Sequence, residues 1–216
     1  MARLHNGPMS PNDRRASAAA ERNRAPILAQ LQRVLPSHGL MLEIASGTGQ
    51  HAAFFSAGLP GWRWLPSDGD GEALASIGAW CAGLARVLAP LHLDVLQPQW
   101  PGVPETVDAV FCANMIHIAP WACCAGLMQG AARHLSPQGL LVTYGPYLED
   151  EVATSPGNLA FDADLRARNP AWGLRRREDV AQEAARAGLA LRERVAMPAN
   201  NLLLVWHRAD GVQSRA

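Results

Sequence analysis

The residues best suited to chemistry in this chain lie in the run LEIASGTGQH, residues 42–51. A short apolar segment carries an acid, Glu43, and then breaks into a turn that contains Gly47 and Gly49. Glycines let the backbone turn tightly and approach a ligand, and the helix that follows offers unpaired N–H groups. The carboxylate of Glu43 would repel a pyrophosphate but attract an ammonium or sulfonium group. The turn is therefore predicted to hold a cationic ligand.

Two cofactor chemistries fit a glycine turn of this kind. The pattern Gly47-x-Gly49-x-x-Ala52, followed by Asp68, is similar to the fingerprint of dinucleotide-binding folds. Two features count against an NAD-binding oxidoreductase. Glu43 lies beside the turn, and the sequence has no lysine, which removes the Tyr-x-x-x-Lys pair of single-domain dehydrogenases. The missing lysine also excludes a Walker A loop and a pyridoxal-phosphate Schiff base. S-adenosylmethionine, which carries both cations and no phosphate, is the predicted cofactor.

Two further carboxylates follow predicted strands and extend the predicted cofactor site. Asp68 can accept hydrogen bonds from both ribose hydroxyls, whereas Asp70 lies in a Gly-Asp-Gly turn where aspartate is common for local reasons. Asp94, flanked by Val95, could accept from the adenine amino group or could simply cap the next segment. The complete predicted cofactor-binding set is Glu43, Ala45, Ser46, Gly47, Gly49, Asp68, Asp94, Val95 and Asn114.

Candidate catalytic residues follow the fourth and fifth predicted strands. Asn114 and His117 come directly after the fourth, and His117 is the candidate general base because an unperturbed imidazole titrates near neutrality. A lone histidine is nevertheless often structural. Tyr144 ends the fifth strand as a second catalytic candidate, and its phenol and that of Tyr147 either line a substrate pocket or pack with satisfied hydroxyls. The histidines elsewhere lack metal-ligand spacing and the cysteines form no C-x-x-C pair, so no metal site is predicted.

Alternating strands and helices are needed to bring these residues to one edge of a sheet. Strands are predicted near 40–45, up to 68, and at 91–95, 107–112, 140–144, 189–195 and 201–207, with helices from Pro26 and at 48–57, 72–87, 121–134 and 178–187. This alternation predicts a Rossmann-like α/β fold, with a seven-stranded, mostly parallel sheet and helices on both faces. The last two strands are joined too tightly for a crossover, so an antiparallel C-terminal hairpin is expected.

The chain is predicted to form a single domain over residues 17–208. A polar, flexible segment is expected at 1–16 and a tail at 209–216. The stretch 146–173, called the cover segment below, lies between the fifth strand and the last helix and is expected to cover the substrate. The predicted substrate-binding residues are Arg22, Asn23, Tyr147, Asn158, Asp162 and Asn200.

Composition narrows the class of partner. The formal net charge is zero, so nothing favours binding to nucleic acid or to an anionic membrane. Residues 1–15 lack the apolar region of a secretory signal, and no apolar run is long enough to span a bilayer, so a cytoplasmic location is expected. The expected substrate is a compact neutral or cationic small molecule, and the expected state is a monomer or homodimer.

Several segments taken together resemble an uncharacterised methyltransferase-like family, that of the methyltransferase-like twenty-six protein. The matching segments are 20–23, 43–51, 66–68, 111–117, 144–146, Asn158 with 161–162, and 197–201. The resemblance implies a class I S-adenosylmethionine-dependent methyltransferase fold, with cofactor contacts at Glu43, Gly47, Gly49, Asp68 and Asp94. Ala45 departs from the usual class I pattern, which has a glycine there. A methyl group is tolerated at that position if the residue has a negative φ.

The implied reaction is methyl transfer to a small molecule. An oxygen, nitrogen or sulfur nucleophile would attack the sulfonium methyl group in line, with the two held in near-attack geometry. Two alternatives share the fold and the cofactor: a cyclase or lyase that uses the cofactor differently, and a binding module without catalysis. The NAD-binding oxidoreductase is the less favoured third.

Overall fold

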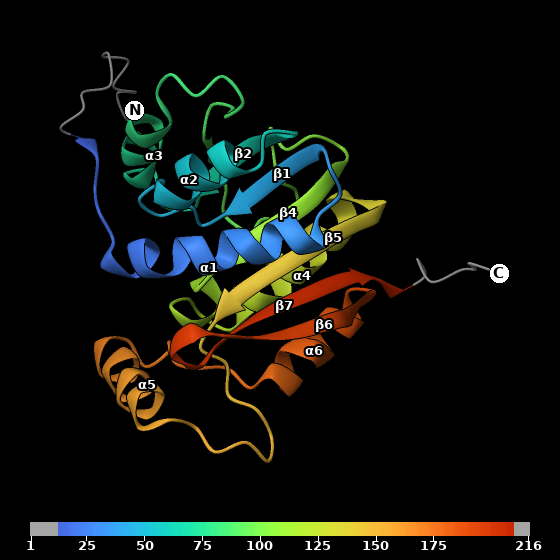
Figure 1. Ribbon diagram of the computed structural model, residues 1–216. Coiled ribbons are helices and arrows are strands. Elements are labelled where there is room, and N and C mark those ends of the chain that lie inside the picture. The colour runs from blue at the N-terminus through green and yellow to red at the C-terminus, as the bar shows by residue number, and fades with distance from the viewer. Residues whose placement is uncertain (1–12, 210–216) are drawn as a thin grey trace.

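The structure, a computed structural model, describes residues 13–209 (Figure 1). The strands are β1 (Gly39–Ile44), β2 (Trp62–Asp68), β3 (Leu91–His92), β4 (Val107–Ala113), β5 (Leu135–Gly145), β6 (Leu189–Met197) and β7 (Asn201–Arg208). The helices are α1 (Ala18–Val34), α2 (Gln50–Gly58), α3 (Ala73–Cys81), α4 (Ala122–His134), α5 (Pro156–Arg168) and α6 (Arg177–Arg186), with short 3₁₀ turns η2 (Met115–His117) and η3 (Pro198–Asn200). No helix within the described range is both long and apolar enough to cross a lipid bilayer.

All seven strands form one sheet, in the order β3-β2-β1-β4-β5-β7-β6. The pairs from β3 to β5 are parallel, and β7 is antiparallel to both of its neighbours, β5 and β6. The predicted mixed sheet with an antiparallel C-terminal hairpin is therefore confirmed. The strand order reverses between β1 and β4, and ligands of open α/β sheets bind at the carboxyl ends of strands beside such a reversal.

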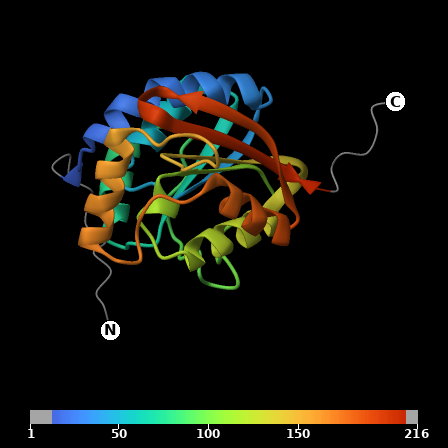
Figure 2. The same ribbon diagram turned by 90° about the horizontal axis from the view of Figure 1, so that it is seen from below.

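Helices cover both faces of the sheet, as predicted (Figure 2). On one face α1, α2 and α3 pack over Met41, Phe111 and Val142, and on the other α4 and α6 pack over Leu42, Val110 and Leu141. Successive strand residues point to opposite faces, so Glu43, two residues after Met41, points toward the α1–α3 side. Helix α5 belongs to neither layer and lies at the edge where β5 ends (Figures 1 and 2).

The first helix begins earlier than predicted. It starts at Ala18, where the Ser17 side chain accepts a hydrogen bond from the Ala20 N–H, and Pro26 lies inside the helix instead of at its first position. Proline has no N–H to donate to the carbonyl four residues earlier, so one helical bond is missing there. The prediction failed because Ser17 is a stronger start signal than Pro26, and the apolar residues that suggested the helix all follow the proline.

Three other predicted boundaries were also wrong, and one helix was not predicted. The third strand ends at His92 and leaves Asp94 in a loop, and α3 ends at Cys81 instead of reaching residue 87. The fifth strand, predicted at 140–144, begins at Leu135, and its register with β4 shifts between residues 135 and 140. The cover segment contains a full helix, α5, which was not predicted. Because that helix buries only Leu165, it gave no amphipathic signal to detect.

Candidate functional site

The backbone is strained on both sides of the strand reversal. Ala45 follows β1 with φ 55° and Asn114 follows β4 with φ 63°. Asparagine tolerates this left-handed region, but alanine does not, because its Cβ approaches the following carbonyl oxygen. The condition under which a methyl group is tolerated at Ala45, a negative φ, is therefore not met. Strain of this kind concentrates at ligand sites, where the surrounding structure holds the chain in place.

We expect Ala45→Gly to stabilise the protein by about 0.5–1 kcal/mol, because the relief of a left-handed alanine outweighs the greater freedom of glycine in the unfolded chain. Urea unfolding would measure the gain. Ala29→Gly, on the exposed side of α1, is the matched control and should lose about 1 kcal/mol. An equal loss at both positions would contradict the assigned strain.

The glycine turn is fastened to the end of β2. The Ser46 N–H donates to the Ser67 carbonyl oxygen at 2.8 Å, and the Gly47 N–H donates to Asp68 Oδ2 at 2.8 Å. Ser46 itself is buried, and its hydroxyl accepts from the Ser67 N–H at 3.2 Å. The Ser46 carbonyl oxygen also accepts from the Gly49 N–H at 3.0 Å, so both the backbone and the hydroxyl of Ser46 are bonded within the protein, whereas Gly47 is exposed.

Glu43 is a buried acid beneath this turn. Its side chain is almost fully buried, and Oε2 accepts a hydrogen bond of 2.7 Å from the indole N–H of Trp64. Burial raises the pKa of the Glu43 carboxyl to about 8, although hydrogen bonds from Trp64 and Ser46 oppose the rise. Burial thus makes the negative charge of Glu43 costly, and a cation placed beside the carboxylate would stabilise that charge.

Asp68 and Asp94 lie at the same carboxyl edge, after β2 and β3. Asp68 is half-buried and holds the turn through Oδ2, while its Oδ1 accepts from the Asp70 N–H at 2.9 Å. Each carboxylate oxygen can accept a second bond. Asp94 Oδ1 accepts from the Leu96 N–H at 2.9 Å, a local capping contact, and Val95 is buried. Both acids therefore have structural bonds and keep spare acceptor capacity.

His117 is buried at the ends of β4 and β5. Neither ring nitrogen has a hydrogen-bond partner among the described residues, and the ring stands edge-on to Tyr147 with centroids 4.7 Å apart. A Cβ added to Gly145 would lie 2.4 Å from His117 Nε2, so the imidazole fits there only because residue 145 is glycine. Burial, and then the charge of Arg175, lower the His117 pKa to about 3, so the ring is neutral.

The start of α1 lies over the end of β5 and joins two predicted residues. Asn23 Oδ1 is 2.7 Å from His51 Nε2, and the Asn23 side chain also hydrogen-bonds Tyr144. Arg22 is close enough to lower the pKa of the Tyr144 phenol, although burial raises it more. His51, buried and stacked on Phe55, was not among the predicted site residues. Its position within the 43–51 motif was the available signal.

The segment before α1 is tied to α3 over its described part. Arg14 Nε donates to the Ala79 carbonyl oxygen at 3.0 Å, and the Arg15 N–H donates to Ser76 Oγ at 2.9 Å. Ser76 in turn donates to the Thr48 carbonyl oxygen at 2.8 Å, in the glycine turn. Residues 13–16 are thus connected to the turn. The remainder of the predicted segment, 1–12, and the tail from 210 onward lie outside the described residues.

Three of the predicted substrate residues meet in one small pocket. Tyr147, Asn158 and Asn200 line a cavity of about 130 Å³ between the cover segment and the β6–β7 hairpin. Asn158 Nδ2 donates to the Asn200 carbonyl oxygen at 3.1 Å. Asp162 does not line this cavity, because its Oδ1 accepts from the Leu174 N–H at 2.7 Å and holds the end of the cover segment.

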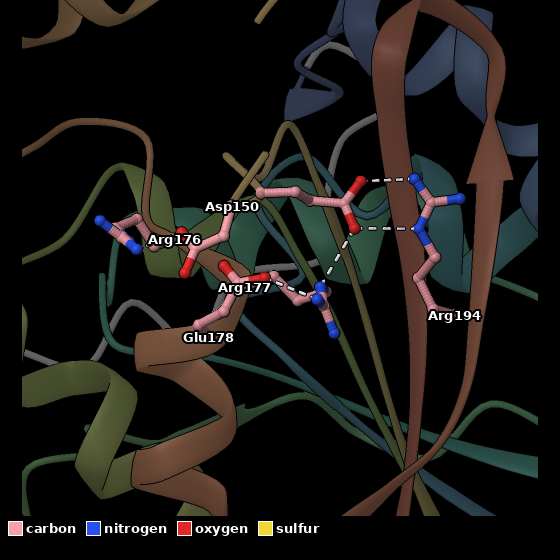
Figure 3. Close-up of polar contacts among 6 residues, drawn as sticks. Asp150, Arg176, Arg177, Glu178 and Arg194 are labelled. Carbon is pink, nitrogen blue, oxygen red and sulfur yellow. Dashed lines mark hydrogen bonds and ion pairs between the residues drawn. The ribbon is translucent and has the colours of Figure 1, made fainter. Parts of the chain in front are cut away.

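An ion-pair network anchors the beginning of the cover segment (Figure 3). Glu149 pairs with Arg194 of β6 and, at 3.1 Å, with the Nε of Arg177 at the start of α6. Asp150 pairs with Arg176, the residue before α6. Hydrogen bonding to Arg194 is the main reason that the pKa of Glu149 lies below its ordinary value. The segment is thus fastened to the last helix and to the hairpin.

A family model matches residues 14–208 and is described as "Protein of unknown function (DUF938)". The chain belongs to the DUF938 family. That membership assigns no activity, but the match spans the glycine turn, the strand reversal and the cover segment of this DUF938 chain.

Solved structures show what fold the DUF938 chain has. CalO1, a methyltransferase in calicheamicin biosynthesis in its SAH-bound form, matches with a TM-score of 0.71 and 17% identity, over 88% of this chain and 55% of its own. The mitomycin 7-O-methyltransferase MmcR matches with 0.75 and 15%, over 89% and 55%. A family 2 O-methyltransferase of Planctomyces limnophilus, in complex with apigenin, matches with 0.71 and 19%, over 92% and 62%.

These similarities establish the class I methyltransferase fold for the DUF938 chain, and with it the predicted fold class. The chain spans little more than half the length of CalO1 and MmcR. The match leaves out the remaining parts of CalO1 and MmcR.

Proposed function

We propose that this protein is an S-adenosylmethionine-dependent methyltransferase that acts on a small-molecule nucleophile. The observation that carries the proposal is Glu43, a buried acid at the strand reversal whose side chain hydrogen-bonds Ser46 of the glycine turn, in which Gly47 is exposed. The turn suits close approach by a ligand, and the acid suits a cation. The likeness to methyltransferases such as CalO1, solved in its SAH-bound form, supports this choice of cofactor.

Six of the nine predicted cofactor residues have a stated role in this proposal. Gly47 and Gly49 would let the backbone approach the amino-acid end of the cofactor, whose ammonium Glu43 would attract from below. Asp68 would bind the ribose, and Asp94 with Val95 would flank the adenine. When bound, the cofactor would supply an electrophilic methyl group. The protein would contribute mainly orientation, because holding nucleophile and methyl in line removes much of the barrier.

His117 and Tyr144 are the proposed groups on the acceptor side. Neutral His117 has two buried ring nitrogens without a hydrogen-bond partner among residues 13–209, so one of them would accept a hydrogen bond from a substrate hydroxyl once the covering residues move aside. Tyr144 is held by Asn23, so it would orient the substrate without leaving its place. We also propose that the cover segment, with Tyr147, Asn158 and Asn200, lies over the acceptor. The mitomycin and apigenin named for the solved neighbours support a small-molecule acceptor.

We further propose that the DUF938 family is related to the methyltransferase-like twenty-six family. The support is the shared order of motifs from residue 20 to residue 201, which covers most of the chain. This relationship would extend the fold assignment but adds no substrate.

The proposal is tested by calorimetric titration of S-adenosylmethionine, S-adenosylhomocysteine and NAD into the wild-type protein and Asp68→Ala. We expect the first two to bind, and the variant to lose about 1.5–3 kcal/mol of binding free energy, because a charge-assisted hydrogen bond is removed. Asp70→Ala is the matched control, since Asp70 lies in the same loop and its carboxylate accepts a local hydrogen bond from the Glu72 N–H.

Three outcomes would separate the candidate functions. Binding of NAD alone would overturn the proposal in favour of the oxidoreductase. Tight binding of S-adenosylmethionine without turnover, unaffected by His117→Ala or Tyr144→Phe, would indicate a binding module. Products derived from the cofactor alone, with no methylated acceptor, would indicate the cyclase or lyase.

A further inference from the structure

A second cavity shares no lining residue with the small pocket. It has a volume of about 460 Å³ and opens between α5, the start of α4 and α6. Its walls include Trp121, Leu148 and Leu174, together with Arg166 and Arg175. None of the predicted cofactor or substrate residues lines it. Its volume is within the range of small-molecule sites.

The charged residues of this cavity are not equally neutralised. Arg166 pairs with Asp162, Arg176 with Asp150 and Arg186 with Glu183, each partner lying outside the lining. Arg175 differs from them, because it has no carboxylate partner among residues 13–209. Its Nε donates to the Ile116 carbonyl oxygen at 3.2 Å, and Nη2 donates to the carbonyl oxygens of Ala119 and Ala171.

The positive charge of Arg175 is therefore held by neutral dipoles in a half-buried position. Burial, and then the neighbouring charge of Arg166, lower its pKa. The Nη1 side of the guanidinium has no hydrogen bond among the described residues, and a planar guanidinium binds carboxylates and phosphates well. The lining acid Asp179 forms no ion pair with Arg175 and lies in the first turn of α6.

The remaining walls suit a flat apolar body. The Trp121 ring lies under the Arg175 guanidinium, with the Arg175 Cζ 5.7 Å from the ring centroid, and Leu148 and Leu174 complete an apolar side. We propose that this cavity binds a small organic anion, with its carboxylate or phosphate on Arg175 and a flat apolar body against Trp121. The proposal does not depend on the proposed methyltransferase function, because the cavity is separate from the glycine turn.

Such a ligand would also act on the segment that carries His117. Arg175 holds the carbonyl oxygen of Ile116, the residue before His117, and the Gly173 N–H donates to the His117 carbonyl oxygen at 2.9 Å. The charges that act on the His117 ring are Arg175, which lowers its pKa, and Asp162, which raises it. The effect of Arg175 is the larger of these two charge effects, and an anion bound to Arg175 would offset it. The His117 pKa should therefore rise when the cavity is filled.

The test is titration of the cofactor-free protein with benzoate, phenyl phosphate and the neutral isostere benzamide, followed by NMR of the tryptophan indole and histidine ring signals. We expect at least one of the two anions to bind about tenfold more tightly than benzamide and to shift the Trp121 indole and His117 ring signals. Whichever of benzoate and phenyl phosphate binds more tightly shows whether the cavity favours a carboxylate or a phosphate. No S-adenosylmethionine is present in this experiment, so a failure to bind the anions would not contradict the proposed methyltransferase function. A failure to bind S-adenosylmethionine would likewise not contradict the proposed anion site.

Three variants make the test specific. Arg175→Gln should weaken benzoate or phenyl phosphate binding about tenfold. Arg208→Gln is the matched control, since Arg208 also donates to two backbone carbonyl oxygens, of Ala132 and Leu135, but lies outside the lining. Asp179→Asn should tighten binding by roughly twofold, and it keeps the proposal testable if Arg175→Gln does not fold. Equal affinity for benzamide, no binding of any probe, or anion binding unchanged in Arg175→Gln would overturn the proposal.

Discussion

Replacement of Gly49 by alanine is expected to destabilise the protein by about 3 kcal/mol or more and to lower its melting temperature by roughly 10 °C. Gly49 has φ 89°, and a Cβ there would lie 2.6 Å from the Cα of Ile77 in α3. The left-handed backbone alone costs an alanine about 1–2 kcal/mol. The clash adds to this cost, because the atom in the way is backbone and cannot rotate aside. Urea and thermal unfolding of Gly49→Ala would measure the loss.

Gly47→Ala is the matched comparison. Gly47 also has a positive φ, of 58°, but a Cβ there would have no atom within 4 Å. It should therefore cost only about 1 kcal/mol of stability. Its methyl group would occupy the open side of the turn, where the proposed cofactor would lie, so it should weaken S-adenosylmethionine binding. A Gly49→Ala protein as stable as Gly47→Ala would contradict the close contact between the turn and α3.

The buried acid Glu43 should make the cofactor-free protein less stable as the pH rises. Its pKa is raised to about 8 from an ordinary 4.5, so the folded state holds its proton more tightly than the unfolded state. The stabilisation is complete below the ordinary value and is lost as the pH rises through about 8. Between pH 6.5 and 8 the loss should be about 2 kcal/mol, at 1.36 kcal/mol per pH unit.

A comparison of wild type with Glu43→Gln separates the Glu43 effect from that of the buried histidines. The pKa of His51 is lowered to about 4 and that of His117 to about 3, so their stabilising effect is present above pH 6.5 and is lost only as the pH falls. Urea unfolding at pH 6.5 and 8 would measure the Glu43 effect, and Glu43→Gln should remove it. An equal pH dependence of stability in wild type and Glu43→Gln would contradict the raised pKa assigned to Glu43.

The same acid should couple cofactor binding to proton release. Below pH 8 a cation that binds beside Glu43 must displace its proton, so the affinity for S-adenosylmethionine should increase with pH up to about 8. Calorimetry in buffers of different ionisation enthalpy would count the protons released. Glu43→Gln should release none.

How much the sequence predicts depends on how local the determining contacts are. The turn after β1 was predictable because Glu43, Gly47 and Gly49 lie within a few residues and their types carry the chemistry. The sheet was predictable because its strands are separated by segments of helical period. The positive φ of Ala45 was not, because an alanine gives no sign of strain, which is imposed by the neighbouring strands.

The sequence also did not predict which residues from distant segments contact one another. Trp64 was not recognised as the partner of Glu43, nor His51 as the partner of Asn23, because strand register and helix packing bring them together. Asp162 was predicted to bind substrate, and that stays a prediction, although the carboxylate holds the Leu174 N–H. A polar side chain in a loop can serve either purpose, and the residue type alone does not distinguish them.

The position of β7 between β5 and β6 has a consequence for biosynthesis. Strands β1 to β5 can pair as they leave the ribosome, but β6 is the edge strand of the sheet over residues 13–209 and pairs there with β7, which is made after it. The anchor of the cover segment on Arg194 of β6 is therefore assembled only after residue 208 has emerged. During synthesis the edge of β5 remains unpaired until then, and this is the interval in which the nascent chain is most exposed to aggregation.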